Sequence, residues 1–502
     1  MSGLDGIVAG VADDIVPGLQ YSLATKRGAQ YVKQRNSSTF YPNTSNTYSI
    51  ASGQRTIRVL ISDAGSSMLD LSTVRIACRI NNTGGEPLLF TGRHLACMFM
   101  RATTRIKGVL VDDVQYYNRL VGMLQSFKPA NANYSDGVGQ LGTGYSDTAN
   151  VLSAITVSGA GAVTASSKAN VAEGIRLLGP DVDPIPANSS RRVIFDLPGI
   201  SALNNHYLLP LGRYPLEIQL ELVKDPKDVL ASGFLNPDGS ISGTKTTPTT
   251  SMTFTIDEVE VKADTLLLDS AVTNNIEEAL VGGKPLSLHL RPWNVTLYNI
   301  SGTSTFSQIF NRAYSRLLSI FVNFLPKKLP DSYAALWTES NLFSSWHGHT
   351  DETGFFPGKK PQYNATRDEF RYQVQLGSHL YPNTAIRSHA ESYYHLQKCV
   401  GELTTGVGVS TGPTYRSTNF HLATDFEKVA STPAGQADFS GVNTKVSGEQ
   451  MRLFFEKITT VEDMAVGTAE ADKWSFAPDI MYICANYDQI VQLRLEGVVL
   501  AD

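Results

Sequence analysis

Two stretches in which apolar and polar residues alternate constrain the fold of this chain more than any other feature. The segment from Met252 to Lys262 alternates in this way, and its apolar phase slips by one position across Asp257-Glu258. The segment from Val491 to Leu500 alternates similarly and slips across Gly497. Alternation is typical of a strand with one buried face, and a slip of one position indicates a β-bulge that bends the strand. Because each segment closes a long β-rich stretch, the sequence predicts two copies of one β-rich domain.

The order of elements in the two halves supports this duplication. In the first half, strands begin at about Tyr48, a helix of 3.6-residue period follows Asp112-Asp113, and a loop rich in Gly, Ser and Thr extends from Lys128 to Ala172. The second half restarts with the alternating residues Leu286 to Leu290, which are predicted to correspond to the first-half strand Ile57 to Ile61. Its own helix and loop follow later.

The second-half helix includes Glu391 and Leu396, and its Tyr393-Tyr394 pair resembles Tyr116-Tyr117 of the first half. The second loop extends from Gly401 to Gly448. Both loops are long for a compact domain, which is typical of functional surfaces or of disordered segments. We therefore predict an N-terminal arm (1–42), a first domain (43–265), a connector (266–284) and a second domain (285–502).

Composition excludes several classes of function. A formal net charge of -5 over 502 residues gives no global field that would attract nucleic acid or an anionic membrane. No window approaches the roughly 18 apolar residues of a membrane span, and no secretory signal is expected at the N-terminus. Cys78, Cys97, Cys399 and Cys484 are far apart in the sequence, so we expect buried free thiols rather than a zinc site or redox pair.

Candidate catalytic and ligand-binding motifs are few. The sequence Gly137-Val-Gly-Gln-Leu-Gly matches a dinucleotide fingerprint in its letters, but neither a parallel strand nor a helix flanks it. His347, His349 and Asp351 resemble a metal-ligand cluster that lacks a third histidine, and a polar turn is the simpler interpretation. Acidic pairs such as Asp112-Asp113 and Glu277-Glu278 suit helix starts, where the helix dipole stabilises them. We therefore predict a protein that is not an enzyme and binds no cofactor.

The N-terminal arm combines an apolar stripe with a basic run. The stripe has helical spacing and consists of Leu4, Ile7, Val8, Val11 and Ile15. The basic run lies in an extended tail without periodicity and consists of Lys26, Arg27, Lys33 and Arg35. A helix this short is marginal alone in water, so the stripe is expected to dock on another surface. A frayed terminus is the other interpretation.

From about Phe40 to Asp502 the chain resembles the double jelly-roll major capsid proteins of the tectivirus–adenovirus lineage, and among them those of virophages and polinton-like viruses. The resemblance depends on the order of several short stretches along a duplicated β-chain. These stretches are Asn46-Thr-Tyr-Ser-Ile, Thr56-Ile-Arg-Val-Leu-Ile, Leu69-Asp-Leu-Ser-Thr-Val-Arg-Ile, Gly108-Val-Leu-Val-Asp-Asp-Val-Gln-Tyr-Tyr, Arg192-Val-Ile-Phe-Asp-Leu-Pro, Leu380-Tyr-Pro-Asn-Thr-Ala-Ile and Glu391-Ser-Tyr-Tyr.

The resemblance implies an all-β fold of two tandem eight-stranded jelly-roll sandwiches with short helices and long surface loops. It also implies a homotrimer that forms a pseudo-hexagonal capsomer of an icosahedral shell in the virion. Neighbouring capsomers, penton and minor capsid proteins would then be partners. The N-terminal arm is expected to dock mainly on a neighbouring protein at the inner face, with its basic run as a secondary contact to an inner membrane or the genome. A small-molecule substrate is not expected. A carbohydrate-binding or adhesin-like double β-sandwich is the competing hypothesis, because jelly rolls also host lectins.

Overall fold

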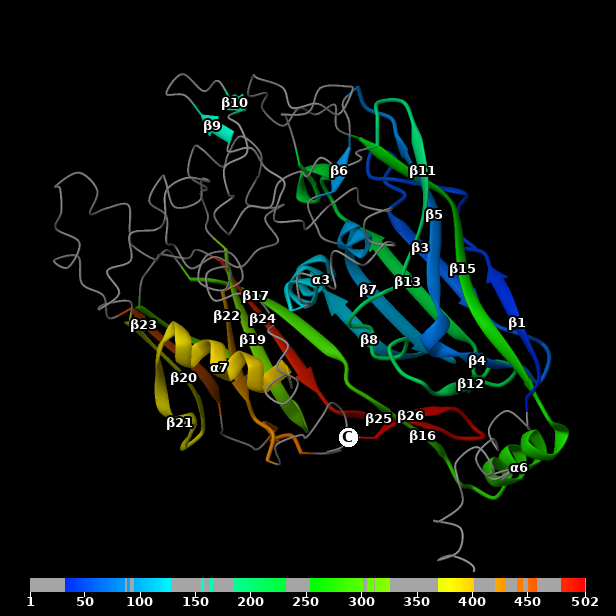
Figure 1. The fold of residues 1–502 in the computed structure, drawn as a ribbon. Coiled ribbons are helices and arrows are strands. Elements are labelled where there is room, and N and C mark those ends of the chain that lie inside the picture. Colours follow the sequence, from blue (N-terminus) through cyan, green and yellow to red (C-terminus); the bar gives the residue numbers. More distant parts are fainter. Residues whose placement is uncertain are drawn as a thin grey trace, which may run out of the picture.

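A computed structural model describes fourteen segments of the chain, which together form two β-rich halves (Figure 1). The described residues are 32–85, 88–90, 94–127, 155–157, 163–165, 185–231, 253–300, 305–310, 312–325, 369–400, 420–428, 440–445, 450–457 and 480–501. Buried apolar side chains from both halves belong to one continuous hydrophobic cluster.

The first half contains two principal antiparallel sheets. In one, strands lie in the order β11-β5-β15-β4-β12, and β1 and β2 also pair with β15. In the other, the order is β3-β13-β7-β8. The strands of the two sheets are β1 (Val32–Phe40), β2 (Thr47–Ser49), β3 (Thr56–Ile61), β4 (Met68–Asp70), β5 (Arg75–Asn82), β7 (Phe99–Ile106), β8 (Val109–Gln115), β11 (Ser190–Phe195), β12 (Leu208–Pro210), β13 (Leu216–Leu222) and β15 (Phe254–Leu268).

The second half repeats the two four-strand rows and adds a small sheet. Its rows are β17-β24-β19-β22 and β18-β23-β20-β21, and the added sheet is β16-β25-β26. The strands are β16 (Leu286–Leu290), β17 (Trp293–Asn299), β18 (Thr305–Phe310), β19 (Leu317–Leu325), β20 (Glu369–Leu376), β21 (His379–Ser388), β22 (His421–Asp425), β23 (Met451–Lys457), β24 (Ile480–Tyr487), β25 (Gln489–Leu493) and β26 (Val498–Ala501).

Helices and short strands complete the described structure. The helices are α3 (Tyr117–Ser126), α6 (Ser270–Val281) and α7 (His389–Val400), with the 3-10 turns η3 (Leu71–Thr73), η4 (Leu95–Met98) and η5 (Pro226–Asp228). Two further strand pairs are β6 (Leu89–Phe90) with β14 (Leu230–Ala231), and β9 (Ile155–Val157) with β10 (Val163–Ala165).

The two halves share one strand connectivity. In the first half the rows β2-β15-β5-β11 and β3-β13-β7-β8 are connected in the chain order β2, β3, β5, β7, β8, α3, β11, β13, β15. In the second half the corresponding order is β17, β18, β19, β20, β21, α7, β22, β23, β24. Each strand therefore has the same neighbours as its counterpart, and a helix precedes the sixth strand in both halves. The predicted duplication of a jelly-roll fold is confirmed at the level of strand order.

Alternating side chains explain why these segments form half-buried strands. Along β13 the residues from Leu216 to Leu222 are alternately buried and partly exposed, and β3 alternates between exposed and buried from Thr56 to Ile61. The two strands pair in register, with Ile218 opposite Val59. Apolar residues on one side of this row thus reach the core, while the polar residues face outwards.

One predicted bulge is confirmed, and the other is wrong. Pairing of β15 with β5 shifts register between Asp257 and Glu260, and Glu258 there has a φ of 48°. Gly497 instead lies in the tight turn that joins β25 to β26, where its backbone exchanges hydrogen bonds with that of Arg494. A chain that reverses direction also shifts its apolar phase, so the alternation alone did not distinguish a hairpin from a bulge.

Three other predicted assignments differ from the structure. Within the described residues, regular β-structure begins at β1 rather than at Tyr48, because residues 32–40 of the expected tail pair with β15. The restart at Leu286–Leu290 is not the counterpart of β3, since it pairs with β25 in the added sheet. The second expected loop, 401–448, contains β22, whose five-residue sequence is too short and too polar to show a strand period.

The acidic pairs also differ from their predicted positions. Asp112 and Asp113 lie within β8, so neither begins a helix. Glu277 and Glu278 lie in the second half of α6, whose N-terminus is capped instead by Asp269, which accepts a hydrogen bond from the backbone N–H of Ala271. Within the connector α6 joins β15 to β16 (Figure 1).

Candidate assembly surfaces

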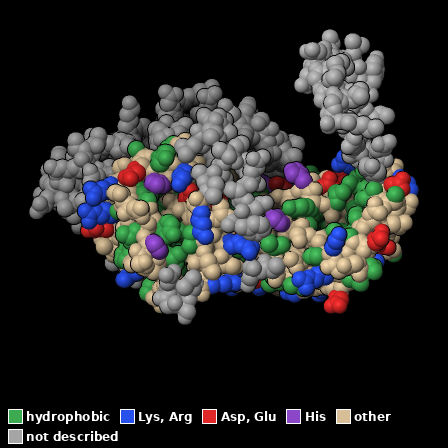
Figure 2. All heavy atoms as spheres, turned by 90° about the horizontal axis from the view of Figure 1, so that it is seen from below, with side chains coloured by type: hydrophobic (Ala, Val, Ile, Leu, Met, Phe, Trp, Pro, Cys, Tyr) green, Lys and Arg blue, Asp and Glu red, His purple; other side chains and the backbone are tan. Residues whose placement is uncertain are grey.

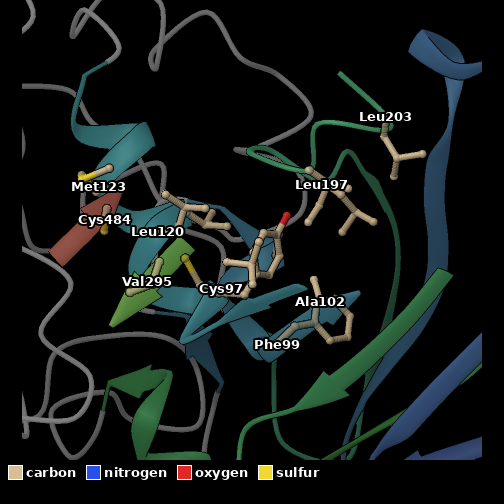
Figure 3. Packing of buried hydrophobic residues seen from close by; sticks show 14 of the residues in the cluster. Cys97, Phe99, Ala102, Leu120, Met123, Leu197, Leu203, Val295 and Cys484 are labelled. Atoms are coloured by element: carbon tan, nitrogen blue, oxygen red, sulfur yellow. The ribbon is translucent and has the colours of Figure 1, made fainter. Parts of the chain in front are cut away.

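The two halves meet where α3 and β8 of the first half lie against the row β17-β24-β19-β22 of the second. Strand β8 packs against β17. Nine of the ten residues of α3 are buried, and Figure 3 shows Leu120 and Met123 of this helix in one cluster with Val295 and Cys484 of the second half. Because α3 is buried on nearly all sides and packs against residues of both halves, this helix holds the halves together.

Aromatic side chains provide specific contacts at this joint. Phe127, just after α3, lies with its ring centroid 5.3 Å from that of Phe321 on β19 and 5.3 Å from that of His421 on β22. Trp293 on β17 contacts the same Phe321 ring at 5.6 Å. Aromatic pairs in such geometries stabilise more than their buried area alone.

A buried polar network crosses the joint beside these rings. The hydroxyl of Ser126 and Nε2 of His421 are 2.8 Å apart, and Nδ1 of the same histidine is hydrogen-bonded to the side-chain amide oxygen of Asn323. All three residues are buried. Buried polar groups require partners, so the network fixes how the two halves are aligned rather than only how tightly they adhere.

The added sheet of the second half makes a separate contact with the first half. The hydroxyl of Tyr214 donates a hydrogen bond of 2.9 Å to the backbone carbonyl of Arg494, next to the β25–β26 turn. Burial raises the pKa of this tyrosine, which keeps the hydroxyl protonated as a donor. On α6, Glu277 forms an ion pair with Arg213 at 3.4 Å.

Asp112 holds the segment after β11 against β8. Its carboxylate accepts hydrogen bonds from the backbone N–H groups of Ser201 (3.1 Å) and Ala202 (3.0 Å), and from the hydroxyls of Ser201 (2.6 Å) and Thr104 (2.8 Å). Burial raises the pKa of this carboxyl, and the hydrogen bonds oppose that shift. Asp113 instead faces outwards and pairs with Arg101. Position in a strand, not at a helix start, therefore explains this acidic pair.

The structure describes only two of the residues predicted for the assembly arm. Lys33 and Arg35 lie on β1, where Lys33 is 3.7 Å from Asp269 and Arg35 forms an ion pair with Asp264. Both basic groups therefore pair with acids of the same chain. The other arm residues, Leu4, Ile7, Val8, Val11, Ile15, Lys26 and Arg27, lie outside the described residues.

The sheet face that the first half turns away from its core carries an ionic network. Glu258 accepts from Arg79 and from Arg192, at 2.8 Å each, and Arg192 also donates to Glu260 at 2.8 Å. These side chains come from β5, β11 and β15 and are partly exposed. The left-handed backbone of Glu258 at the bulge places this carboxylate between the two arginines.

Among the residues that the structure describes, no group of three or more His, Cys, Asp or Glu side chains could hold a metal ion. His347, His349, Asp351 and the Gly137–Gly142 motif lie outside the described residues. A cavity of about 410 Å³ lies at the joint of the halves, and its wall includes Arg291 and Asp488, which are 3.4 Å apart.

Figure 2 shows Lys and Arg side chains interspersed with Asp, Glu and hydrophobic residues over the described part of one face. No helix within the described ranges is long and apolar enough to cross a bilayer.

All four cysteines are free thiols, as the sequence predicted. Cys78, Cys97 and Cys484 are buried, and Cys399 is partly buried.

Comparison with known proteins gives matches by structure alone. No protein-family model matches the chain, and no curated protein does. A quasi-atomic model of the PBCV-1 virus capsid aligns with a TM-score of 0.55 and 12% identity over 94% of this chain and 97% of that one. The crystal structure of PBCV-1 VP54, fitted into a reconstruction of the virophage Sputnik, aligns over the same shares with a TM-score of 0.54 and 12% identity.

The Faustovirus major capsid protein is also similar, with a TM-score of 0.51 and 11% identity over 91% of this chain and 90% of that one. At sequence identity this low, the structural likeness shows the fold and not the function. Because the likeness extends over nearly the whole length of each chain, it includes both halves and their connection. The chain therefore has the fold of the double jelly-roll major capsid proteins.

Proposed function

We propose that this chain is a structural major capsid protein that forms trimeric, pseudo-hexagonal capsomers of an icosahedral shell and catalyses no reaction. One observation carries the proposal: two halves with the same strand order are joined by a buried interface, in a fold that aligns with viral capsid proteins over more than 90% of the chain. The halves serve as two domains, which meet at the connector that contains α6.

Symmetry gives a physical reason for this assembly. Three chains with two similar domains each provide six near-equivalent sides, and a closed trimer of such chains can tile a hexagonal lattice. Exposed strand edges must be protected from uncontrolled pairing. Edge strand β21 contains Pro382 and pairs irregularly with β20, with two register shifts, and both features disfavour further strand addition.

The remaining partners follow from this role. Neighbouring capsomers, penton and minor capsid proteins would contact the outer rim of the trimer, and the protein would be located in the capsid shell of the virion. Residues 1–31 would reach another protein, an inner membrane or the genome. The pairing of Lys33 and Arg35 with acids of their own chain favours the apolar residues of the arm, rather than its basic run, as the main contact.

The mass of the purified full-length protein tests the proposal. Size-exclusion chromatography with light scattering should give three times 54.6 kDa, about 164 kDa, and concentrated trimers should form curved or closed shells visible by electron microscopy. A stable monomer at every concentration, together with binding to a glycan array, would instead support the carbohydrate-binding hypothesis.

A further inference from the structure

The cavity of about 410 Å³ at the joint has walls from both halves of the chain. The first half provides Leu124 of α3 and residues of the segment 199–207, which follows β11. The second half provides residues of 289–293, where β16 passes into β17, and 488–489 at the start of β25. Sites for small ligands typically have volumes of about 300–1,000 Å³ and lie preferentially between domains. The cavity therefore has the size and the position of a ligand site.

The first-half wall is held in place by its own hydrogen bonds. Asp112 accepts from the backbone N–H groups of Ser201 and Ala202, as described above. The amide nitrogen of Asn205 donates to the carbonyls of the same two residues at 2.9 Å each, and its amide oxygen accepts from the backbone N–H of Tyr207 at 2.9 Å. This wall is thus formed before a ligand arrives, which lowers the entropy cost of binding.

The second-half wall is fixed as well. The backbone N–H of Asp488 donates to the carbonyl of Arg316 at 3.0 Å, and the carboxylate of Asp488 lies 3.4 Å from Nε of Arg291. The ring of Trp293 packs against Phe321 with 5.6 Å between the centroids. Both walls are therefore pre-organised, and a ligand between them would contact the two halves at once.

The charges of the cavity indicate a neutral ligand. Among the described residues that line it, Arg291 and Asp488 are the only Lys, Arg, Asp or Glu side chains, and they form an ion pair with each other. An anion near Arg291 would be repelled by Asp488, and a cation near Asp488 would be repelled by Arg291. An uncharged molecule that accepts hydrogen bonds from one side chain and donates to the other avoids both penalties.

Several polar groups of the lining retain hydrogen-bonding capacity. Oε1 of Gln489 is buried and has no hydrogen-bond partner among the described residues. Asn204 donates from its amide nitrogen to the carbonyl of Leu197 at 3.2 Å, which leaves its amide oxygen as an acceptor. A buried polar atom without a partner requires an explanation, and a ligand hydroxyl would supply one. The terminal torsion of a glutamine has broad minima, so this amide can turn towards a ligand at little cost.

Two aromatic side chains from opposite halves complete the lining. Tyr207 of the first half is 37% exposed, so the cavity opens at the surface there, and Trp293 of the second half is partly buried. Both side chains combine an apolar ring with a polar group. A pyranose ring has the matching chemistry, because its C–H groups form apolar faces and its hydroxyls both donate and accept hydrogen bonds.

We propose that this cavity binds one neutral sugar residue, packed against Tyr207 and Trp293, with its hydroxyls hydrogen-bonded to Asn204, Gln489 and the Arg291–Asp488 pair. The sugar is bound and not converted. It is either a free saccharide or the terminal residue of a glycan, since both present the same hydroxyls. The inference goes beyond the proposed capsid function and does not depend on it, because the walls belong to a single chain.

Saturation-transfer NMR on the full-length protein tests the binding. The probes are the methyl glycosides of glucose, galactose and mannose, together with N-acetylglucosamine, and the comparison probes are anionic sialic acid and the nucleobase cytosine. We expect transfer to the ring C–H groups of at least one neutral sugar and none to sialic acid. No transfer to any neutral sugar, or stronger transfer to cytosine, would overturn the proposal.

A glycan array then distinguishes the two sources of the sugar. Retention of the protein on immobilised oligosaccharides that end in the bound sugar identifies a glycan ligand. Binding of the free sugar without retention on the array identifies a free saccharide. Trimers or shells that bind no sugar would overturn only this inference, whereas a monomer that binds sugar would overturn only the proposed capsid function.

Gln489→Met separates a binding role from a structural one. The substitution keeps the length of the side chain and removes a buried oxygen that has no partner among the described residues, so the melting temperature should stay the same or rise. Affinity for the sugar should fall by about tenfold, because one set of hydrogen bonds is lost. The matched control is Gln492→Met on the same strand, outside the cavity lining, which should bind as the wild type does.

Tyr207→Ala gives an independent readout from the other half. The exposed ring should be dispensable for folding, yet its loss should weaken sugar binding by about tenfold or more. Tyr41→Ala is its control, because Tyr41 is 66% exposed and does not line the cavity. Saturating sugar should also raise the melting temperature of the wild type more than that of either cavity variant. Wild-type affinity in both cavity variants would overturn the site.

Discussion

The ring of Tyr116 meets the ring of Tyr482 edge to face, with 5.6 Å between the centroids and 66° between the planes. Tyr116 immediately precedes α3 and has a left-handed backbone with a φ of 51°, while Tyr482 lies on β24 of the other half. The guanidinium of Arg119 lies over the same Tyr482 ring at 5.6 Å. Tyr482 of the second half thus contacts two side chains of the first half, those of Tyr116 and Arg119.

Replacement of Tyr482 by alanine should weaken the joint between the halves. The side chain is buried, and loss of a large buried ring typically costs about 3 kcal/mol or more. We expect a lower midpoint in guanidinium unfolding, or a split into two transitions if the halves become independent. Tyr482→Phe keeps the ring and should remain within about 1 kcal/mol of the wild type. Equal losses for both variants would show that the ring contacts are not the stabilising part.

Asp112→Ala should destabilise the first half strongly. It would leave the backbone N–H groups of Ser201 and Ala202 buried without their acceptor, and each such group costs about 1–3 kcal/mol. Asp113→Ala is the matched control, because it removes only an outward-facing pair with Arg101, worth about 0–1 kcal/mol. Thermal unfolding of the two variants should therefore differ clearly. Similar melting temperatures would contradict the role assigned to Asp112.

Gly441→Ala should be costly because the site has no room for a Cβ atom. That atom would lie 2.7 Å from the carbonyl carbon of Arg316 and 2.8 Å from the carbonyl oxygen of Leu317, and both are backbone atoms. Overpacking of this kind costs about 1–3 kcal/mol.

The control for this substitution is Gly497→Ala. A Cβ at Gly497 meets nothing within 4 Å, and this glycine is not among those with positive φ. Its free energy of unfolding should change by less than about 0.5 kcal/mol. A large loss at Gly497 would contradict the open space that surrounds this glycine in the turn.

Thiol labelling should distinguish native from unfolded protein across a wide pH range. Burial raises the pKa of Cys78 and of Cys97 to about 12, so both stay protonated and unreactive between pH 7 and pH 10. In the unfolded chain the ordinary thiol pKa of about 8.5 makes labelling rise steeply over that range. Mass spectrometry after iodoacetamide treatment should find these two residues unmodified in native protein. Fast modification of either one at pH 8 would contradict their burial.

Deletion of residues 1–31 should separate folding from assembly. The deletion stops before β1, so the pairing of this strand with β15 and the ion pair of Arg35 with Asp264 are retained. We expect trimers with an unchanged melting temperature but impaired closure into shells. Normal shells with the same salt resistance as wild type would rule out an assembly role for the arm.

The sequence by itself predicted those features that depend on local periodicity. Alternation identified β3 and β15, the 3.6-residue period identified α3, and the residues around Glu391 and the Tyr393-Tyr394 pair indicated α7. The slip at Asp257-Glu258 identified a true bulge, since both sides of it stay in one strand. The duplicated order of these elements predicted two β-rich halves, and the resemblance to the capsid family implied that these halves are jelly rolls.

Tertiary structure alone decided features that depend on partners distant in the sequence. The same phase slip is a hairpin turn at Gly497, and β1 and β22 are strands only because β15 and β19 pair with them. Asp112 and Asp113 are adjacent in the sequence, yet one is buried under four hydrogen bonds and the other pairs at the surface. The burial of α3 and the exposure of α7 also follow from packing between halves, because local sequence determines which face is apolar but not what covers it.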